Sequence, residues 1–571
     1  MSIEGIEKLG VYDVVVVGAG LAGLMAAIHA AQRGVSVLVV SKSHPVRSHT
    51  AAAEGGIAAW IPGASDPRDS WLQHAYDTVK GGDFLVDQHA AEILAREAYP
   101  TIMLLERWGV LFTRDEEGRI ARRPFGGHRY PRTRFVEDKT GMAIMHVVYE
   151  QALRLGIDML DEVFALDVVV WQGRVYGVVA VDLREARPLY IQAKAVVLAA
   201  GGAGMIYKHT TNNYFNTGDG YAMALRAGAA LKDMEFIQFH PTALYPTDIL
   251  ITEAARGEGG HLINAKGERF MARYAPQWME LAPRDVVARA IATEILEGRG
   301  FEGGYVLLDL THLGEERIRE RLPTVREAAR RYAGVDPAKE PIPVRPAQHY
   351  MMGGVDVDID GHSPDVTGLF AAGETACISV HGANRLGSNS LLEAAVFGKR
   401  AGLAAASYAL GRGSGEPPAE AVREPVERLY SLLRRERSGV ELGEARRELR
   451  EVMWVKVGLF REEKGLAEAV SRLTDLYKRV LDGIVVPSRG RGWYDLALAY
   501  ETLNMVTVGL VVARAALERR ESRGAHYRLD YPKRDDENYL KHSLVRLRGD
   551  SLEVGWRKVE VRRWEPGERA Y

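Results

Sequence analysis

Residues that could do chemistry on a small anion stand in three separate segments. His240 lies in QFHPTALY, Arg284 in LAPRDVVAR and Arg385 in HGANRLGSNS. Both residue types can hold carboxylate groups, and arginine can do so through two parallel hydrogen bonds that lysine cannot reproduce. Judged by residue type alone, a single histidine is more often a packing residue and an arginine is usually a solvated surface charge. These residues therefore need support from their surroundings.

An acidic and a basic residue three positions apart form a second candidate group. Glu253 and Arg256 lie in ITEAARGEGG, and they share one face if this segment is helical. A buried pair of this kind could carry protons, but an ordinary surface ion pair has the same spacing. The spacing alone favours the surface ion pair.

A glycine-rich turn, GAGLAG at residues 18–23, is the third candidate, and it lies between a strand and a helix. The run YDVVVV at 12–17 predicts a buried parallel strand, residues 22–32 a helix, and residues 35–40 the next strand. In such a unit the glycines allow a tight turn, close approach to a pyrophosphate and close packing of helix on strand. The helix N-terminus offers free N–H groups to phosphates. The sequence therefore predicts a dinucleotide site.

The segment that follows the second strand departs from an ordinary NAD site. An acidic residue that holds a ribose hydroxyl is expected there, but the chain has Ser41 and Lys42. Serine can still hydrogen-bond the sugar. Residues 41–60 are rich in small side chains and contain His44 and His49, which suggests close packing against a flat ligand.

Further strands and helices of an α/β protein surround this unit. Residues 241–349 differ in composition from the segments around them, because they contain many histidines, arginines and prolines. They are a plausible inserted domain. The GRGSGEPP segment at 411–418 is the clearest linker. The other predicted elements are helices at 90–108 and 138–155, a hairpin of 163–171 with 174–181, a strand at 195–200, a helix opened by Gly218, Asp219 and Gly220, and helices between 420 and 520.

Composition excludes several classes of protein. The 571 residues include 74 Lys and Arg and 76 Asp and Glu, for a formal charge of −2, which excludes a strongly basic nucleic-acid binder and an acidic disordered chain. The single cysteine, Cys377, excludes an intramolecular disulfide framework and a cysteine-ligated iron–sulfur cluster within this chain. No metal site is predicted.

Neither of the two longest apolar runs is predicted to span a membrane. The run at 14–31 is interrupted by glycines and His29, and the run at 505–517 contains Arg514 and is too short. The first ten residues do not resemble a signal peptide. We expect the chain by itself to be soluble and to reach a membrane only through other subunits.

Several motifs together closely resemble one family, the flavoprotein subunits of succinate dehydrogenase and fumarate reductase. The similarity is in register along nearly the whole chain. The motifs are RSHTAAAEGG (47–56), DTVKGGDFLVDQ (77–88), QFHPTALY (238–245), ITEAARGEGG (251–260), HGANRLGSNSLLEAAVFG (381–398) and ESRGAHYRLDYPKRDDENYLKH (521–542). The runner-up, L-aspartate oxidase, shares the fold and the tail motif but lacks the RSHT histidine.

The resemblance implies an α/β fold in four parts. A Rossmann-like FAD-binding domain occupies 1–240 and 350–412, and an α+β capping domain at 241–349 interrupts it. A helical bundle domain follows at 419–525, and a short C-terminal domain at 526–571.

FAD is the cofactor that the resemblance implies. In this family the RSHT histidine carries FAD covalently, which corresponds to His49; spacing alone leaves His44 as a competitor. Glu374 matches an acid that holds the adenosine ribose, and Ser390 and Leu391 offer N–H groups to the isoalloxazine at a helix N-terminus. The expected cofactor contacts are Gly18, Ala19, Gly20, Gly23, Ser41, Lys42, Ser48, His49, Thr50, Glu54, Gly55, Gly56, Asp219, Glu374, Ser390 and Leu391.

Position 54 departs from many family members. Glu54 stands where many succinate-oxidising members have glutamine and some fumarate-reducing members have glutamate. A carboxylate beside the flavin would disfavour the anionic reduced form and lower its potential. This favours fumarate reduction weakly, and the physiological direction stays open.

The resemblance also implies the roles of the chemical residues. The substrate carboxylates are expected to be held by His240, Thr252, His349 and Arg385. Arg284 corresponds to the proton donor and acceptor, and Glu253 with Arg256 to the proton path. Because free guanidinium holds its proton tightly, Arg284 needs such a path.

Electrons must leave this chain through partners. The family implies an iron–sulfur subunit and a membrane anchor through which quinone is reached, and it implies no nucleic acid. The expected location is the cytoplasmic side of the cell membrane, on its inner face. The alternatives left open are an L-aspartate oxidase-like enzyme, a fumarate reductase that works only in the reductive direction, and a non-catalytic subunit with a relic FAD site.

Overall fold

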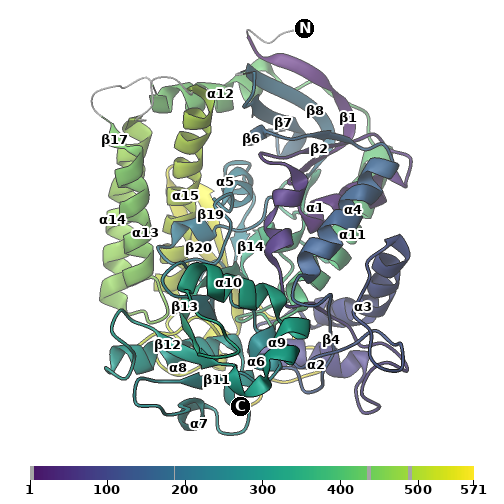
Figure 1. The fold of residues 1–571 in the computed structure, drawn as a ribbon. Coiled ribbons are helices and arrows are strands. Elements are labelled where there is room, and N and C mark those ends of the chain that lie inside the picture. Colours follow the sequence, from purple (N-terminus) through teal and green to yellow (C-terminus); the bar gives the residue numbers. More distant parts are fainter. Residues whose placement is uncertain (1–4, 186, 434–438, 486–491) are drawn as a thin grey trace.

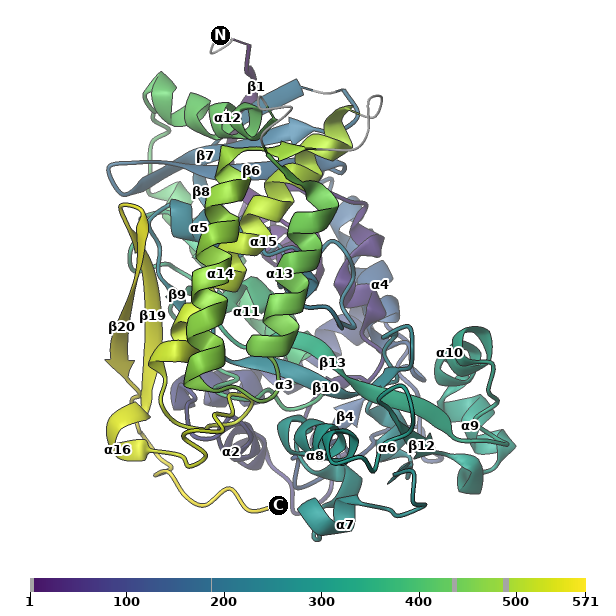
Figure 2. The same ribbon diagram turned by 90° about the vertical axis from the view of Figure 1, so that its left-hand side faces the viewer.

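The computed structural model describes residues 5–185, 187–433, 439–485 and 492–571. Within these ranges a mixed sheet with helices against it forms one end of the molecule, and a segment with its own small sheet forms the other (Figure 1). A group of long helices and a terminal hairpin lie along the side, as Figure 2 shows. The predicted α/β class and the order of its parts are confirmed, whereas the domain limits stay predictions.

The larger sheet carries the dinucleotide turn. Among the described residues its strand order is β5-β2-β1-β8-β7-β6, with β15 also paired to β8. β1 (Glu7–Val17) pairs in parallel with β2 (Val37–Val40) and β8 (Arg187–Leu198), and α1 (Leu21–Ala31) connects β1 to β2. The four valines that end β1 are buried, as expected for a strand covered on both faces. The predicted βαβ unit is therefore confirmed.

The remaining elements of this part extend this sheet, surround it or belong to two smaller sheets. They are β3 (Ile57–Ala58), α2 (Trp71–Gly81), α3 (Gln88–Trp108), β4 (Thr133–Arg134), α4 (Thr140–Arg154), β5 (Asp158–Leu160), β6 (Val163–Trp171), β7 (Arg174–Asp182), α5 (Asp219–Arg226), β9 (Leu231–Lys232), β14 (Gly354–Asp356), β15 (Leu369–Ala371), β16 (Ala376–Cys377) and α11 (Asn389–Leu410). The predicted helices and hairpin are confirmed. β1 and β8 begin earlier than predicted, because polar residues interrupt the apolar pattern in their first halves.

Two helices meet closely beneath the dinucleotide turn. A Cβ at Gly402 of α11 would lie 2.1 Å from the carbonyl oxygen of Ala26 in α1, so only glycine permits this approach. Each helix begins beside the same cavity, α1 just after Gly20 and α11 just after Ser388.

The capping segment, defined as residues 241–349, has a hydrophobic core of its own. Its sheet has the order β10-β13-β12-β11. Two of these strands, β10 and β13, cross the predicted limits of the segment and so connect it to the rest of the chain. The elements are β10 (Ile237–Leu244), α6 (Ala254–Gly257), β11 (His261–Ile263), α7 (Met271–Tyr274), α8 (Arg284–Leu296), β12 (Val306–Asp309), α9 (Glu315–Arg321), α10 (Pro323–Ala333) and β13 (Ile342–Met351).

Long helices and a hairpin form the C-terminal quarter of the chain. They are α12 (Ala419–Leu433), β17 (Val440–Glu441), α13 (Leu442–Lys456), α14 (Glu463–Asp482), β18 (Ile484–Val485), α15 (Gly492–Glu518), α16 (Asp536–Tyr539), β19 (Lys541–Arg548) and β20 (Ser551–Lys558). β19 pairs with β9 and β20, which ties the hairpin to the N-terminal part.

One of these helices corrects a prediction. The apolar run at 505–517 was expected to be too short to cross a membrane, but it belongs to a helix whose 494–518 portion is long and apolar enough. Within the described residues, 83% of that portion's apolar window is buried inside the fold. The helix is therefore a core helix, which explains its composition without a membrane.

Candidate active site

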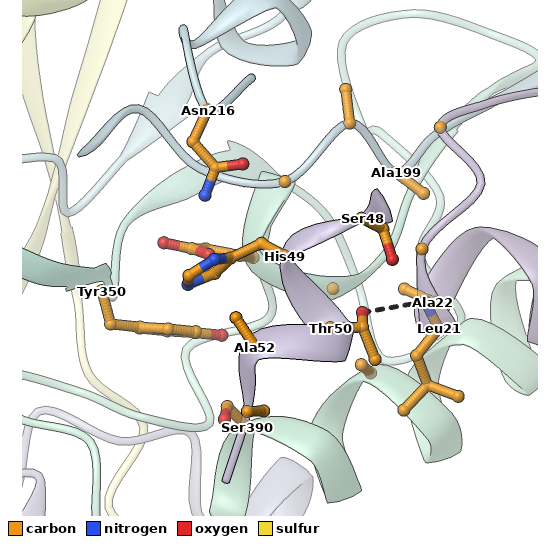
Figure 3. A pocket seen from close by; sticks show the side chains of 18 of the residues that line it. Leu21, Ala22, Ser48, His49, Thr50, Ala52, Ala199, Asn216, Tyr350 and Ser390 are labelled. Atoms are coloured by element: carbon orange, nitrogen blue, oxygen red, sulfur yellow. Dashed lines mark hydrogen bonds between the residues drawn. The ribbon is translucent and has the colours of Figure 1, made fainter. Parts of the chain in front are cut away.

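A single long cavity connects the dinucleotide turn to the capping segment. It encloses about 1500 Å³ of empty space, part of which is open to solvent. The turn at 18–22 lines one end, the RSHT segment the middle, and side chains of the capping segment the other end. Figure 3 shows the ring of His49 projecting into this space between Asn216 and Tyr350.

The dinucleotide end has the features that a pyrophosphate requires. Gly20, the N-cap of α1, makes no side-chain cap hydrogen bond, so N–H groups of the first turn other than that of Leu21 stay available to a ligand. The hydroxyl of Thr50 accepts from the N–H of Leu21 at 3.1 Å, as Figure 3 shows. A Cβ at Gly23 would lie 1.9 Å from the carbonyl oxygen of Gly18, so Gly23 serves the packing of the turn and does not line the cavity.

The two histidines of the small-residue segment lie in different surroundings. His49 lines the cavity, and its Nδ1 accepts from the N–H of Asn213 at 3.4 Å. Burial, and then the nearby Arg385, lower the pKa of His49 to about 4, so its ring is neutral and nucleophilic at neutral pH. His44 instead packs edge-on against Tyr149, with 5.4 Å between ring centroids. The geometry therefore supports His49 over His44 as the attachment residue.

Lys42 and Asp219 form an ion pair in the cavity wall. The Lys42 Nζ lies 2.7 Å from a carboxylate oxygen of Asp219 and 2.8 Å from one of Glu501 in α15. Asn504, also in α15, donates to the other Asp219 oxygen at 2.8 Å. Both predicted cofactor residues do line the cavity, and this network fixes their side chains to the helical part of the molecule.

Buried carboxyl groups beside the cavity favour their neutral forms. Burial, reinforced by Asp138, raises the pKa of Glu54 well above its usual value. A raised pKa suppresses the charge that was expected to favour fumarate reduction, and the physiological direction stays open. Burial also raises the pKa of Glu374 to about 7 and that of Glu393 to about 8.

The proton-path residues meet at the other end of the cavity. Arg284, the first residue of α8, donates from Nε to Glu253 at 2.6 Å. The Nη2 of Arg256 lies 3.5 Å from the same carboxylate oxygen, with both side chains fully buried. Burial opposes ionisation of Glu253, but the two arginines outweigh it and lower its pKa. The alternative of a surface ion pair is therefore wrong.

A residue that the sequence analysis did not single out joins the two arginines of the site. The Oε1 of Gln238 accepts from Arg284 at 3.1 Å and from Arg385 at 2.9 Å. Its Nε2 donates to the backbone oxygen of Arg385 at 2.6 Å and to Asn384 at 3.0 Å, which fixes the orientation of the amide. Gln238 precedes His240 by two residues on β10, so strand alternation is the signal that could have found it.

The remaining predicted substrate contacts lie around these arginines. The rings of His240 and His349 are 4.8 Å apart, and burial followed by the charge of Arg284 lowers both pKa values well below the usual range. The Nε2 of His240 and the Nε of Arg385 are buried without hydrogen-bond partners among the described residues. Unsatisfied buried groups of this kind indicate a missing ligand.

The structure brings nearly all predicted site residues to one cavity. Every predicted cofactor and substrate contact lines it except Gly23, and so do Arg284 and Glu253, while Arg256 lies behind Glu253. Their functional roles stay predictions. Phe125 and Tyr350 also line the cavity; no motif argument singled them out, although Tyr350 directly follows His349.

Comparison with known proteins identifies the family. Family models match for an FAD binding domain over residues 13–391 and for the fumarate reductase flavoprotein C-terminal region over 446–571. The fumarate reductase flavoprotein subunit of Mycobacterium tuberculosis is 44% identical over 98% of this chain and 99% of its own. The chain belongs to the succinate dehydrogenase and fumarate reductase flavoprotein family.

Two further comparisons lead to the same family. The succinate dehydrogenase flavoprotein subunit of Rickettsia bellii is 43% identical over 93% of this chain and 92% of its own. The FrdA chain of an E. coli quinol fumarate reductase has a TM-score of 0.95 at 39% identity and covers 99% of both chains. These findings confirm the resemblance stated from the motifs and favour it over L-aspartate oxidase. FAD is thus the cofactor of this flavoprotein, and the cavity with its free α1 N-terminus fits it.

Proposed function

We propose that this flavoprotein is a catalytic subunit that interconverts succinate and fumarate and passes the electrons to an iron–sulfur subunit and quinone. The observation that carries the proposal is the cluster of buried cations at the capping-segment end of an FAD-sized cavity. Arg284 and Arg385 share one acceptor there, next to a buried nitrogen of His240 that has no partner among the described residues.

Charge supports a dianionic substrate. Three arginines, Arg256, Arg284 and Arg385, face one carboxylate, Glu253, and the lowered pKa values keep the two histidines neutral. The site therefore carries a formal charge of +2, which balances a diacid with both carboxylates ionised. A buried dianion needs such compensation, because its desolvation is otherwise very costly.

The residues of this chain divide the chemistry between binding and proton transfer. When bound, FAD would supply the hydride chemistry at one carbon of succinate or fumarate. The carboxylates are held by Arg385, His240, His349 and Thr252. Arg284 donates a proton to the neighbouring carbon or accepts one from it. Glu253, 2.6 Å from Arg284, removes or resupplies that proton, and Arg256 continues the path.

Partners follow from the chemistry of electron removal. One cysteine in the whole sequence leaves no Cys-ligated cluster in this chain, so an iron–sulfur subunit must receive the electrons. We place this complex on the inner face of the cell membrane, held by an anchor subunit that gives access to quinone. The named relatives are flavoprotein subunits, which supports this arrangement.

Turnover with artificial acceptors tests the activity directly. The FAD-loaded chain should oxidise succinate with a soluble dye and reduce fumarate with a reduced viologen. Because the partners are absent, it should not reduce quinone by itself. Failure of both dye reactions in protein with full FAD content would refute the function.

Mass analysis of a peptide that contains His49 tests the attachment. We expect an FAD adduct on this peptide after folding with FAD. The His49→Ser variant should bind FAD that acid precipitation releases into the supernatant, whereas His44→Ser should retain it. An adduct on His44 would contradict the assignment.

A further inference from the structure

The last residues of the chain run along the FAD-binding part of the molecule. Gln88, the first residue of α3, accepts at Oε1 from the N–H groups of Arg562, Arg563 and Trp564, and donates to the carbonyl of Trp564 at 2.8 Å. The Trp564 ring lies 5.7 Å from that of Tyr76 in α2. In Figure 2 the yellow C-terminal segment, which follows β20, ends at the mark C near α8. Several independent contacts thus hold it in place.

Arg569 crosses from this part of the molecule to the capping segment. Its Nη1 and Nη2 donate to the two oxygens of Asp285 at 2.7 and 2.9 Å, and Nη2 also donates to the carbonyl of Gly81 in α2 at 2.9 Å. The Asp285 side chain is fully buried and that of Arg569 is 9% exposed. A buried, bidentate pair of this geometry fixes both position and orientation.

Tyr571 makes a second crossing contact. Its ring packs edge-on against Trp278 of the capping segment, with 5.5 Å between centroids. On its other side the ammonium of Lys80 in α2 lies 4.7 Å from the ring centroid and donates to the carbonyl of Ala570 at 3.3 Å. Segment 564–571 therefore contacts both the FAD-binding part and the capping segment. The cavity lies along the boundary, or seam, between these two parts.

We propose that segment 564–571 is a strap that holds the capping segment closed and positions Arg284 for proton transfer. Arg569 binds Asp285, which directly follows Arg284 at the start of α8. Movement of this first turn would carry the Arg284 guanidinium away from Glu253 and Gln238. The strap residues do not line the cavity, so Arg569 is a positioning residue. The proposal rests on the proposed function only for the role of Arg284.

Substitutions in the strap test this proposal. In FAD-loaded Arg569→Ala and Tyr571→Ala, kcat for succinate with a dye should fall about tenfold to a hundredfold, because displacements near 1 Å can cost about a hundredfold. The solvent deuterium isotope effect should rise as proton transfer becomes limiting, while KM changes less. Arg569→Lys keeps the charge but loses the bidentate geometry, so it should fall in between and serve if the alanine variants fold poorly.

Hydrogen exchange provides a readout that needs no turnover. Backbone amides at the start of α8 should exchange faster in Arg569→Ala than in the unaltered chain. The matched control is Arg562→Ala, since this side chain pairs with Glu560 within the tail and should change neither exchange nor kcat. Unchanged exchange and kcat in all three strap variants would overturn the proposal. Absence of activity in the unaltered chain would refute the function while exchange still tests the strap.

Discussion

At the scale of single residues, the function of the site depends on which of its buried groups carry charge. Burial and neighbouring cations keep His49, His240 and His349 neutral, so they can donate or accept hydrogen bonds without adding charge. Glu253 stays ionised because two arginines outweigh its burial. The positive charge left for a substrate is thus confined to the arginines.

Replacing Arg284 should abolish proton transfer but not FAD binding. We expect Arg284→Ala to lower kcat by about a hundredfold to ten-thousandfold, the usual contribution of a positioned acid or base. KM should change less, and FAD content should stay the same. The measurement is succinate oxidation with a dye, and the control is Arg319→Ala, an exposed capping-segment arginine. Normal kcat in the Arg284 variant would exclude it as the proton donor.

Gln238 offers a test of charge at constant shape. A glutamate at this position would pair with Arg284 and Arg385, the cations that should meet the substrate. We therefore expect Gln238→Glu to raise KM for succinate by about tenfold or more, equivalent to about 1.4 kcal/mol. Gln238→Leu loses the shared acceptor without adding charge, so its KM should rise less. Equal KM values in steady-state assays of the two variants would argue against charge competition.

At the scale of elements, a helix distant in sequence completes the wall of the cavity. α15 brings Glu501 and Asn504 to Lys42 and Asp219, which lie in the FAD-binding part. The ion pairs are nearly buried, so each charge depends on its partners. The helical part therefore contributes to the cofactor site as well as to the core.

Removing the central cation should destabilise the fold. Lys42→Met leaves two buried carboxylates short of a partner, and we expect the free energy of unfolding in urea to fall by about 3–5 kcal/mol. FAD retention should fall with it. Lys456→Met removes a more exposed ion pair on α13 and should cost less than about 1 kcal/mol. Equal losses in the two variants would contradict the structural role of Lys42.

Local patterns predicted the elements that depend on local sequence. The alternation of β1, glycine turn, α1 and β2 was recognisable because each element has its own signal within a few residues. The contacts made by Gln238, Glu501 and Arg569 were not, because their partners lie 46 to 459 positions away in sequence. Motif similarity supplied the site residues that spacing could not choose, such as His49 over His44.

At the scale of the whole molecule, buried acids beside the cavity resist ionisation. Glu374 and Glu393 have raised pKa values, about 7 and 8, whereas in the unfolded chain they ionise near pH 4.5. Between these values the folded chain holds protons that the unfolded chain has released, so stability falls as pH rises. The buried histidines, whose pKa values are lowered, act in the opposite sense, because their unfolded forms still carry some protons just above pH 6.5.

Relative to the Glu393→Gln variant, the FAD-free chain should lose stability between pH 6.5 and 8, because the histidines are the same in both proteins. We expect this relative fall in the free energy of unfolding to be on the order of 1 kcal/mol, measured by urea titration at several pH values. The Glu316→Gln variant, changed at an exposed position, should follow the unaltered chain. Parallel profiles of the unaltered chain and Glu393→Gln would show that Glu393 does not titrate in this window.

The seam between the capping segment and the FAD-binding part has a consequence for turnover. Arg284 and Glu253 belong to the capping segment and Arg385 to the FAD-binding part, so a diacid held between them as proposed would act as an ionic cross-link. We expect its departure to need separation of these two parts, so tighter binding of the dianion should lengthen the residence time of product. A variant that binds the dianion more tightly should therefore turn over more slowly.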